Sequence, residues 1–336
     1  MRYWNTLLAT YTYEQLATQL QQGNIALLSA CITALESQIS EHSYPVYSIL
    51  EKCNPIVTPT KRMGFTGVPG AGKSTFINEF GIFCLEKNPS LKLAILAVDP
   101  SSTLSKGSIL GDKTRMQELA IHERAFIRPS PTNGTLGGLN KHTAEVIQLC
   151  EIAGFEWIWV ETVGVGQSET IVKTLTDMFL LLIVPNTGDE LQGIKKGIIE
   201  MVDILLINKI DSYAAKIINK NVGDYTNALH YNPISAKNFL PKVLTTSAIE
   251  ITNFENIYTN IEKYFDHIHL NNFYTQNRTQ QLQQQIEQTL EMQWIEKLYQ
   301  LPFFEEQKTN LLSQIQNNPT QIQNLIQQFL STYFKK

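Results

Sequence analysis

Residues 67 to 75 read Gly67-Val68-Pro69-Gly70-Ala71-Gly72-Lys73-Ser74-Thr75, and this stretch decides the fold. It matches the phosphate-binding loop pattern G-x-x-x-x-G-K-[ST] at every fixed position. The glycines let the backbone wrap closely around a polyphosphate, Lys73 supplies a cation for the β- and γ-oxygens, and Ser74 supplies a hydroxyl for Mg²⁺. All nine residues are therefore predicted to contact a nucleotide. Lys73 is also predicted to act in catalysis, and Ser74 to be a metal ligand.

The sequence on either side of the loop fits this interpretation. Apolar residues at 56–57 and 63–65 predict a short buried strand before it, and residues 75–80 contain neither glycine nor proline, as a following helix requires. Five further apolar runs predict buried parallel strands covered by helices on both faces. These runs are 93–98, 157–160, 179–184, 204–207 and 243–244. The predicted fold is α/β, a P-loop NTPase with a mostly parallel sheet, and ligands should bind at the carboxyl ends of its strands.

Helical patterns flank the sheet on both sides. Apolar residues recur every three or four positions from Leu16 to Ile39, and this stripe is expected to pack on the central domain. After the sheet they recur over 282–298 and 322–330, with Pro302 between the two stretches. We predict an N-terminal helical region (1–55), a nucleotide-binding domain (56–270) and a C-terminal helical region (271–336). The last would form a helical hairpin or a dimer seam.

The composition narrows the class of protein. The net charge of −4 provides no global basic field for nucleic acid. The four cysteines are widely separated and form no C-x-x-C pair, which argues against a zinc site or a disulfide framework and fits a reducing cytoplasm. The N-terminus lacks a secretory signal, and the longest apolar run, 178–184, is too short to span a bilayer. We expect a cytoplasmic protein that binds neither nucleic acid nor membranes.

Two aspartates near the second apolar run are candidate metal ligands. Asp99 follows the run at 93–98 and is placed to hold Mg²⁺ directly or through water. The alternative is a turn-forming role before Pro100. Asp112 lies in the next loop-like stretch and is the weaker candidate, because a turn role fits it equally well.

A second acidic motif, Glu161-Thr162-Val163-Gly164, follows the run at 157–160. An acidic residue at this strand end reaches the magnesium shell in P-loop NTPases, so Glu161 is predicted to be a metal ligand and catalytic. Gly164 lets a backbone N–H approach the γ-phosphate, so the loop after it can sense that phosphate. Gln167 and Glu169 lie on this loop, where they either orient the attacking water or are solvated loop residues.

The base is indicated by Asn208-Lys209-Ile210-Asp211, which follows the run at 204–207. A carboxylate accepts two hydrogen bonds from guanine N1–H and the 2-amino group, whereas adenine offers neither donor there. Ser247 and Ala248 have the place of a second guanine-contacting loop, whose backbone N–H can meet O6. The predicted ligands are therefore GTP and GDP, with nucleotide contacts beyond the phosphate loop from Gly164, Asn208, Lys209, Asp211, Ser247 and Ala248.

Taken together, these motifs resemble the MeaB/ArgK GTPase chaperones. The stretches that carry the resemblance are 67–75, 98–102, 107–116, 126–131, 161–169 and 188–197. The resemblance implies a homodimeric GTPase that uses GTP/GDP and Mg²⁺. It also implies association with an adenosylcobalamin-dependent acyl-CoA mutase, typically methylmalonyl-CoA mutase, where such a protein gates cofactor loading and protects or reactivates the mutase.

The resemblance also assigns roles by position. Asp99, Asp112 and Glu161 would belong to the metal shell and the first two switches, and the C-terminal helices to the dimer interface. Residues 188–197 would form a third switch that brings Lys195 to the active site. On the residues alone, a pair such as Lys195-Lys196 is usually a solvated helix face, although its place after the strand end at Val184-Pro185 puts it within reach of the nucleotide or a partner. Lys106 departs from the family, which usually has glycine there, and could alter the flexibility of the first switch.

Other functions built on the same chemistry remain as alternatives. A nickel-insertion GTPase would typically carry a His-rich tract or a Cys/His site, and the chain has neither. A kinase associated with amino-acid transport would need an acceptor pocket, which the sequence does not reveal. A signal-recognition-type GTPase is disfavoured because the six methionines form no Met-rich domain.

Overall fold

The computed structural model describes residues 2–37, 39–55, 58–99, 116–131, 142–162, 168–185, 196–230, 237–301 and 303–333. The chain divides into two compact units, Met1–Arg278 and Thr279–Lys336. Each unit is described by itself below.

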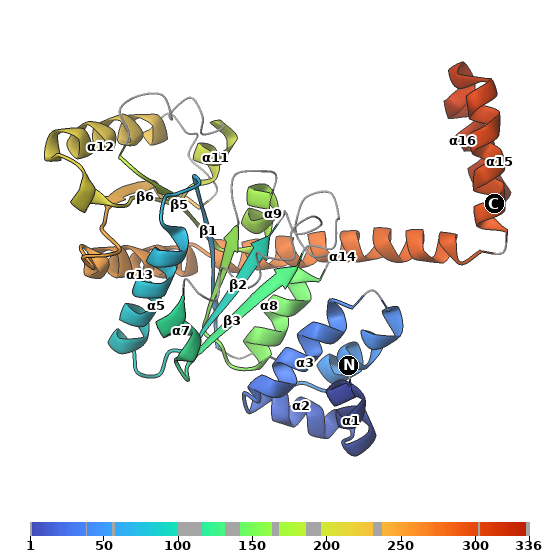
Figure 1. Ribbon diagram of the computed structural model, residues 1–336, viewed down its shortest axis with the longest axis horizontal. Coiled ribbons are helices and arrows are strands. Elements are labelled where there is room, and N and C mark those ends of the chain that lie inside the picture. Colours follow the sequence, from blue (N-terminus) through green and yellow to red (C-terminus); the bar gives the residue numbers. More distant parts are fainter. Residues whose placement is uncertain are drawn as a thin grey trace. The chain divides into compact units, whose positions relative to one another are not determined.

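The first unit is built around a parallel sheet, which has seven strands in the described part of the chain (Figure 1). The strands are β1 (Lys61–Gly67), β2 (Leu93–Asp99), β3 (Ala125–Pro131), β4 (Trp157–Thr162), β5 (Met178–Ile183), β6 (Ile204–Ile207) and β7 (Lys242–Thr245). Their order is β3-β2-β4-β1-β5-β6-β7, and every pairing is parallel. All carboxyl ends therefore meet at one edge, with β1 central between β4 and β5. The predicted α/β P-loop fold is confirmed.

Helices cover both faces of this sheet, because neighbouring strand residues point to opposite sides. Leu181 and Ile183 belong to one hydrophobic cluster, whereas Leu180 and Leu182 belong to the other. The first cluster includes residues of the N-terminal helices, as the stripe at 16–39 predicted. The helices on that face are α1 (Arg2–Thr10), α2 (Tyr13–Gln21), α3 (Ile25–Leu35), α4 (Tyr44–Glu51), α8 (Thr143–Ile152), α9 (Ser168–Leu175), α11 (Lys196–Met201) and α12 (Ala215–His230). The other face is covered by α5 (Lys73–Lys87), α7 (Gln117–Ile121) and α13 (Phe254–Leu270).

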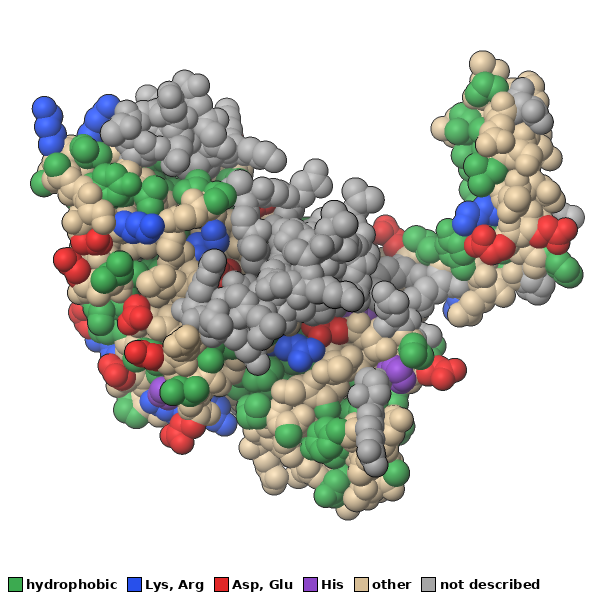
Figure 2. All heavy atoms as spheres, in the orientation of Figure 1, with side chains coloured by type: hydrophobic (Ala, Val, Ile, Leu, Met, Phe, Trp, Pro, Cys, Tyr) green, Lys and Arg blue, Asp and Glu red, His purple; other side chains and the backbone are tan. Residues whose placement is uncertain are grey.

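The second unit is helical. Helix α14 (Phe273–Tyr299) begins in the first unit and continues into the second, which adds α15 (Phe304–Asn317) and α16 (Ile322–Tyr333). The sequence predicted helices over 282–298 and 322–330 but not α15, whose Phe304 ring lies 5.0 Å from Tyr299 and 5.5 Å from Phe329. A stripe of apolar side chains, each more than half exposed, runs along α14; its members are Leu282, Ile286, Leu290 and Trp294. Hydrophobic side chains are visible over this unit in Figure 2.

None of the described helices combines the length and the apolar character needed to cross a bilayer.

Candidate functional site

The phosphate loop connects β1 to α5 and depends on glycine at three positions. Gly70 and Gly72 have φ of +78° and +84°, in the left-handed region that favours glycine. A Cβ at Gly72 would lie 2.8 Å from Asn208 Nδ2, and one at Gly67 would lie only 2.2 Å from the Leu182 carbonyl oxygen of β5. The backbone is thus held in a tight cradle at the carboxyl edge of the sheet.

Lys73, the first residue of α5, reaches back over this cradle. Its Nζ donates to the carbonyl oxygens of Gly67 (2.8 Å) and Val68 (3.4 Å). Burial lowers the pKa of Lys73, and the negative charges of Glu161 and Glu169 oppose that shift. The Lys73 ammonium is therefore held against the loop backbone, with the carboxylates of Glu161 and Glu169 near enough to stabilise its charge.

The two described candidate metal ligands with placed side chains lie together. The Ser74 hydroxyl donates to Glu161 Oε1 at 3.3 Å, and Glu161 is only 3% exposed at the end of β4. The next residue, Thr162, donates to the Thr66 hydroxyl of β1 at 2.9 Å, which ties the two strand ends together. A hydroxyl beside a carboxylate is the hard oxygen donor set that Mg²⁺ prefers, so these residues fit that ion.

Asp99 lies at the same edge of the sheet. It is the last residue of β2, and the β2–β4 register places Val98 opposite Thr162. The backbone of Asp99 therefore lies one residue beyond the level of Thr162, on the strand next to β4, which carries Glu161.

The predicted guanine motifs form one hydrogen-bonded unit with the phosphate loop. Asn208 donates through Nδ2 to the Ala71 carbonyl (2.8 Å) and accepts at Oδ1 from the Ala248 N–H (3.1 Å). The Ser247 hydroxyl donates to Asp211 Oδ1. The pKa of Asp211 is lowered, chiefly by that hydrogen bond. Asp211 is exposed and stays an anionic acceptor, as recognition of guanine N1–H and the 2-amino group requires.

Lys209, between these two residues, has a φ of 61° in the left-handed region. Its Cε lies 3.5 Å from where a Cβ on Gly72 would be, so the lysine stem lies close to the phosphate loop.

The structure therefore brings together the predicted site residues that it describes. They are the nine residues of the phosphate loop, Glu161, Asn208, Lys209, Asp211, Ser247 and Ala248, with the backbone of Asp99. The predicted roles of Asp112, Gly164, Gln167 and Lys195 fall outside the described residues, as does Lys106.

The sequence did not indicate Thr66, and it left Glu169 open between orienting the attacking water and being a solvated loop residue; the burial of Glu169 in α9 rules out the solvated loop. Thr66 pairs with Thr162 across adjacent strands, and Glu169, 1% exposed in the first turn of α9, acts electrostatically on Lys73. A signal for Glu169 was its position just after the Glu161 motif, but a pattern does not show whether such a side chain turns inward.

This combination of features defines a P-loop GTPase. The sheet is parallel, a glycine-rich loop follows its central strand β1, a carboxylate ends the neighbouring strand β4, and a guanine motif follows β6. Comparison with known families is more specific. The model described as "Methylmalonyl Co-A mutase-associated GTPase MeaB" matches residues 28–302. The chain belongs to the MeaB family, as the resemblance indicated.

Several relatives are similar over most of the chain. A Caulobacter vibrioides protein described as a putative GTPase is 46% identical over 248 residues, covering 74% of this chain and 75% of the relative. GTPase ArgK of Escherichia coli is 44% identical over 242 residues, covering 71% and 72%. The mouse mitochondrial methylmalonic aciduria type A homolog is 44% identical over 245 residues, covering 70% and 59%. Among solved structures, an LAO/AO transport system kinase has a TM-score of 0.73 at 31% identity, covering 96% of this chain and 97% of that one.

Proposed function

We propose that the protein binds GTP and GDP with Mg²⁺, hydrolyses GTP, and serves as a chaperone of an adenosylcobalamin-dependent acyl-CoA mutase. The observation that carries the nucleotide part is the Asn208 amide, which joins the phosphate loop at Ala71 to the base loop at Ala248. Phosphate and guanine recognition would therefore depend on one hydrogen-bonded unit. Membership of a family described as methylmalonyl-CoA mutase-associated supports that mutase as the partner.

The described residues divide the work of hydrolysis. Lys73, now bonded to loop carbonyls, would turn its ammonium to the β- and γ-phosphate oxygens. Ser74 and Glu161 would hold Mg²⁺, which neutralises developing charge on the phosphates when bound. Asp211 would select guanine, with Ser247 fixing the orientation of its carboxylate. Asn208 keeps the two loops in register.

The remaining roles in the proposal come from the family. Asp99 and Asp112 would complete the metal shell, Gly164 and Gln167 would respond to the γ-phosphate, and Lys195 would enter the site from the third switch. In the mutase complex, nucleotide state would gate cofactor loading and protection or reactivation. The exposed apolar stripe of α14 supports a homodimer formed by the C-terminal helices, because apolar stripes spaced along a polar helix suit a partner helix.

The proposal is tested by measuring GTP hydrolysis with and without purified cobalamin-dependent mutases. We expect co-purification with one of them and a faster hydrolysis rate in the complex. Lys73→Ala should abolish hydrolysis, whereas Lys87→Ala, at the other end of the same helix, should not. If no mutase binds or stimulates, the chaperone role is wrong while the GTPase role stands. If Lys73→Ala hydrolyses GTP at the wild-type rate, the catalytic site is wrong as well.

Two alternative functions are tested separately, one by its reaction products and the other by metal binding. A kinase, the activity named for the structurally similar LAO/AO transport protein, would transfer labelled phosphate to arginine or ornithine. Release of free phosphate alone would exclude it. A nickel-insertion GTPase would bind nickel stoichiometrically. The described residues contain no group of three or more His, Cys, Asp or Glu side chains that could hold a metal ion.

A further inference from the structure

A largely buried cluster of four charged residues lies at the amino end of the sheet, opposite the phosphate loop. Its members are Arg62, Glu151, Asp177 and Arg278, and we call it the Arg278 cluster. Arg62 and Arg278 both donate to Glu151, and Arg278 also donates to Asp177 at 2.8 Å. The exposed fractions of the Glu151 and Asp177 side chains are 4% and 0%. Two cations match two carboxylates, so displacing any one of them leaves a buried charge without its full set of partners.

The cluster fastens the beginning of α14. Arg278 also donates to the Thr60 carbonyl (2.9 Å), and the neighbouring Asn277 amide donates to Asp177 Oδ1 (3.1 Å) and to the Thr176 carbonyl (3.4 Å). One turn earlier, the Tyr274 hydroxyl donates to the same Thr60 carbonyl at 3.0 Å. Arg278 is the last residue of the first unit, and α14 continues without interruption to Tyr299 in the second.

Two strands lead from the cluster to the phosphate loop. Arg62 N–H donates to Asp177 Oδ2 (3.0 Å), and Asp177 N–H donates to the Arg62 carbonyl (2.8 Å). From this point β1 runs to Gly67, while β5 runs to Leu182, whose carbonyl lies against Gly67.

Helix α9 provides a second and shorter route. It begins at Ser168, directly after the predicted γ-phosphate-sensing loop, and ends at Leu175, two residues before Asp177. Its Val172 packs on β1 so closely that a Cβ on Gly64 would lie 2.7 Å away. A shift at the start of α9 would therefore be transmitted to Thr176 and Asp177, the two residues that hold Asn277.

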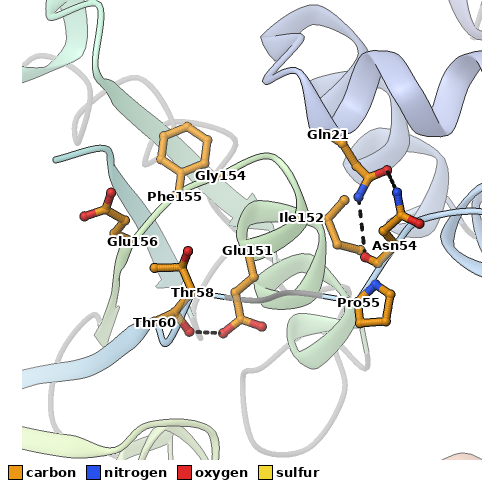
Figure 3. A pocket seen from close by; sticks show the side chains of 10 residues that line it. All are labelled: Gln21, Asn54, Pro55, Thr58, Thr60, Glu151, Ile152, Gly154, Phe155 and Glu156. Carbon is orange, nitrogen blue, oxygen red and sulfur yellow. Dashed lines mark hydrogen bonds between the residues drawn. The ribbon is translucent and has the colours of Figure 1, made fainter. Parts of the chain in front are cut away.

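The cluster also borders a cavity of about 220 Å³ between the N-terminal helices and the turn from α8 to β4. Figure 3 shows Thr60 and Glu151 bonded on one side of it and the Gln21–Asn54 pair on the other. Glu151 lines this cavity, so the carboxylate that both arginines share has open space beside it.

We propose that the Arg278 cluster couples the nucleotide state to α14: movement of α9 on loss of the γ-phosphate changes the hold of Asp177 on Asn277 and Arg278. The start of α14, and through it the C-terminal unit, thereby senses GTP against GDP. This inference rests on the proposed function. Its physical basis is the continuous set of contacts from α9 through Thr176 and Asp177 to Asn277 and Arg278, and genuine coupling requires that both sites bias this element.

The test is hydrogen exchange on the full chain with Mg²⁺ and either GDP or a non-hydrolysable GTP analogue. Peptides covering 67–75 report nucleotide binding, and peptides covering 273–278 report the coupling. We expect both nucleotides to protect 67–75. The exchange rate at 273–278 should differ at least about fivefold between them, the lower end of typical coupling strengths.

Two variants and one control assign this difference to the cluster. Arg278→Met should abolish it, and Asn277→Ala, which removes no charge, should reduce it at least about threefold by the loss of shared hydrogen bonds. Arg124→Met is the control, because Arg124 likewise donates to backbone carbonyls, but to those of Leu85, Asn88 and Leu91, which lie outside the cluster. It should keep the wild-type difference.

Three outcomes overturn the inference. Residues 273–278 could be insensitive to the nucleotide while 67–75 are protected, which defeats the coupling alone. Both variants could keep the wild-type difference, which removes the cluster from the route. If neither nucleotide protects 67–75, the proposed function fails and the coupling fails with it.

Discussion

The two ends of β1 use charge in opposite ways. At the carboxyl end, the single cation of Lys73 faces the two carboxylates of Glu161 and Glu169, over a loop built from left-handed glycines. At the amino end, the two arginines of the Arg278 cluster balance its two carboxylates and donate hydrogen bonds directly to them. This difference suits a ligand that brings its own charge and metal at the carboxyl end, whereas at the amino end the charges are satisfied within the fold. Breaking each end should therefore affect different quantities.

The largest effect is expected at the amino end. Glu151→Leu leaves two largely buried arginines, each 17% exposed, without their shared carboxylate and should lower the free energy of unfolding by about 3–5 kcal/mol. Urea unfolding at neutral pH, followed by tryptophan fluorescence, measures this. Glu255→Leu is the control, since Glu255 pairs with Lys87 at the surface and such pairs contribute less than about 1 kcal/mol. Equal losses for the two variants would contradict the distinction.

The same carboxylate predicts a pH dependence. Burial alone would raise the pKa of Glu151, but the hydrogen bonds and charges of Arg62 and Arg278 outweigh it and lower the pKa to about 2. Because the folded pKa lies below the ordinary 4.5, the stabilisation is complete above pH 4.5 and is lost as the pH falls toward 2. It amounts to on the order of 3 kcal/mol. The stability gap between wild type and Glu151→Gln should close over this range, and a constant gap would count against the pairing.

At the carboxyl end the effect should appear in rate rather than stability. Lys73→Met should reduce GTP hydrolysis about 10²–10³-fold, the usual loss when one charge-stabilising group is removed. Because burial lowers the pKa of Lys73, the fold disfavours its charge, and the variant should lose little or no stability toward unfolding. Single-turnover hydrolysis and urea unfolding of the same variant give both numbers. A large loss of stability with normal hydrolysis would reverse the interpretation.

A third set of charged residues extends the comparison, because it contains two lysines and only one carboxylate. Buried Asp203 pairs with both Lys173 and Lys237. Burial lowers the pKa of Lys237 to about 8, against the opposing charge of Asp203. Since the unfolded chain then binds more protons between pH 8 and 10.5, wild-type stability should rise over that interval by up to about 3 kcal/mol. Lys237→Met should lack this rise in urea unfolding at pH 7 and 10, and an identical rise in the variant would disprove the assignment.

The smallest effect concerns base recognition. Ser247→Ala removes the hydroxyl that orients Asp211, and the loss of one hydrogen bond of about 1 kcal/mol should weaken GDP binding about fivefold. The hydrolysis rate at saturating GTP should stay unchanged, because the Ser247 hydroxyl bonds to Asp211 and to the Glu250 N–H, both outside the phosphate loop. Ser90→Ala, in an exposed turn, is the control. A reduced rate at saturation with unchanged affinity would place Ser247 in the catalytic step instead.

Much of the carboxyl end was predictable from the sequence. The strands that carry the site are uninterrupted apolar runs, and the loop and guanine motifs are local patterns whose residues fold next to one another. Strand β3 was missed, since Arg128, Pro129 and Pro131 break its apolar run. It lies at the edge of the sheet, where a strand tolerates proline. The pattern also did not reveal that both ends of the Asn208 amide are used to join two loops.

The Arg278 cluster could not be predicted in the same way. Its members lie at positions 62, 151, 177 and 278, and each is an ordinary charged residue in its own neighbourhood. Only the parallel arrangement of β1 and β5, together with the ends of α8 and α9, brings them to one place. Charge partners separated by about a hundred residues leave no local periodicity to detect.

A guanine-nucleotide site at the carboxyl end of β1 can be tested by titrating the full chain with GDP and with ADP in the presence of Mg²⁺. We expect one GDP per chain and binding of ADP at least about 100-fold weaker, since adenine offers neither of the two donors and leaves the Asp211 carboxylate without a hydrogen bond from the base. The preference should be lost in Asp211→Ala but kept in Asp224→Ala, a change at an exposed position of α12. Equal affinities for GDP and ADP in the wild-type protein would contradict the account.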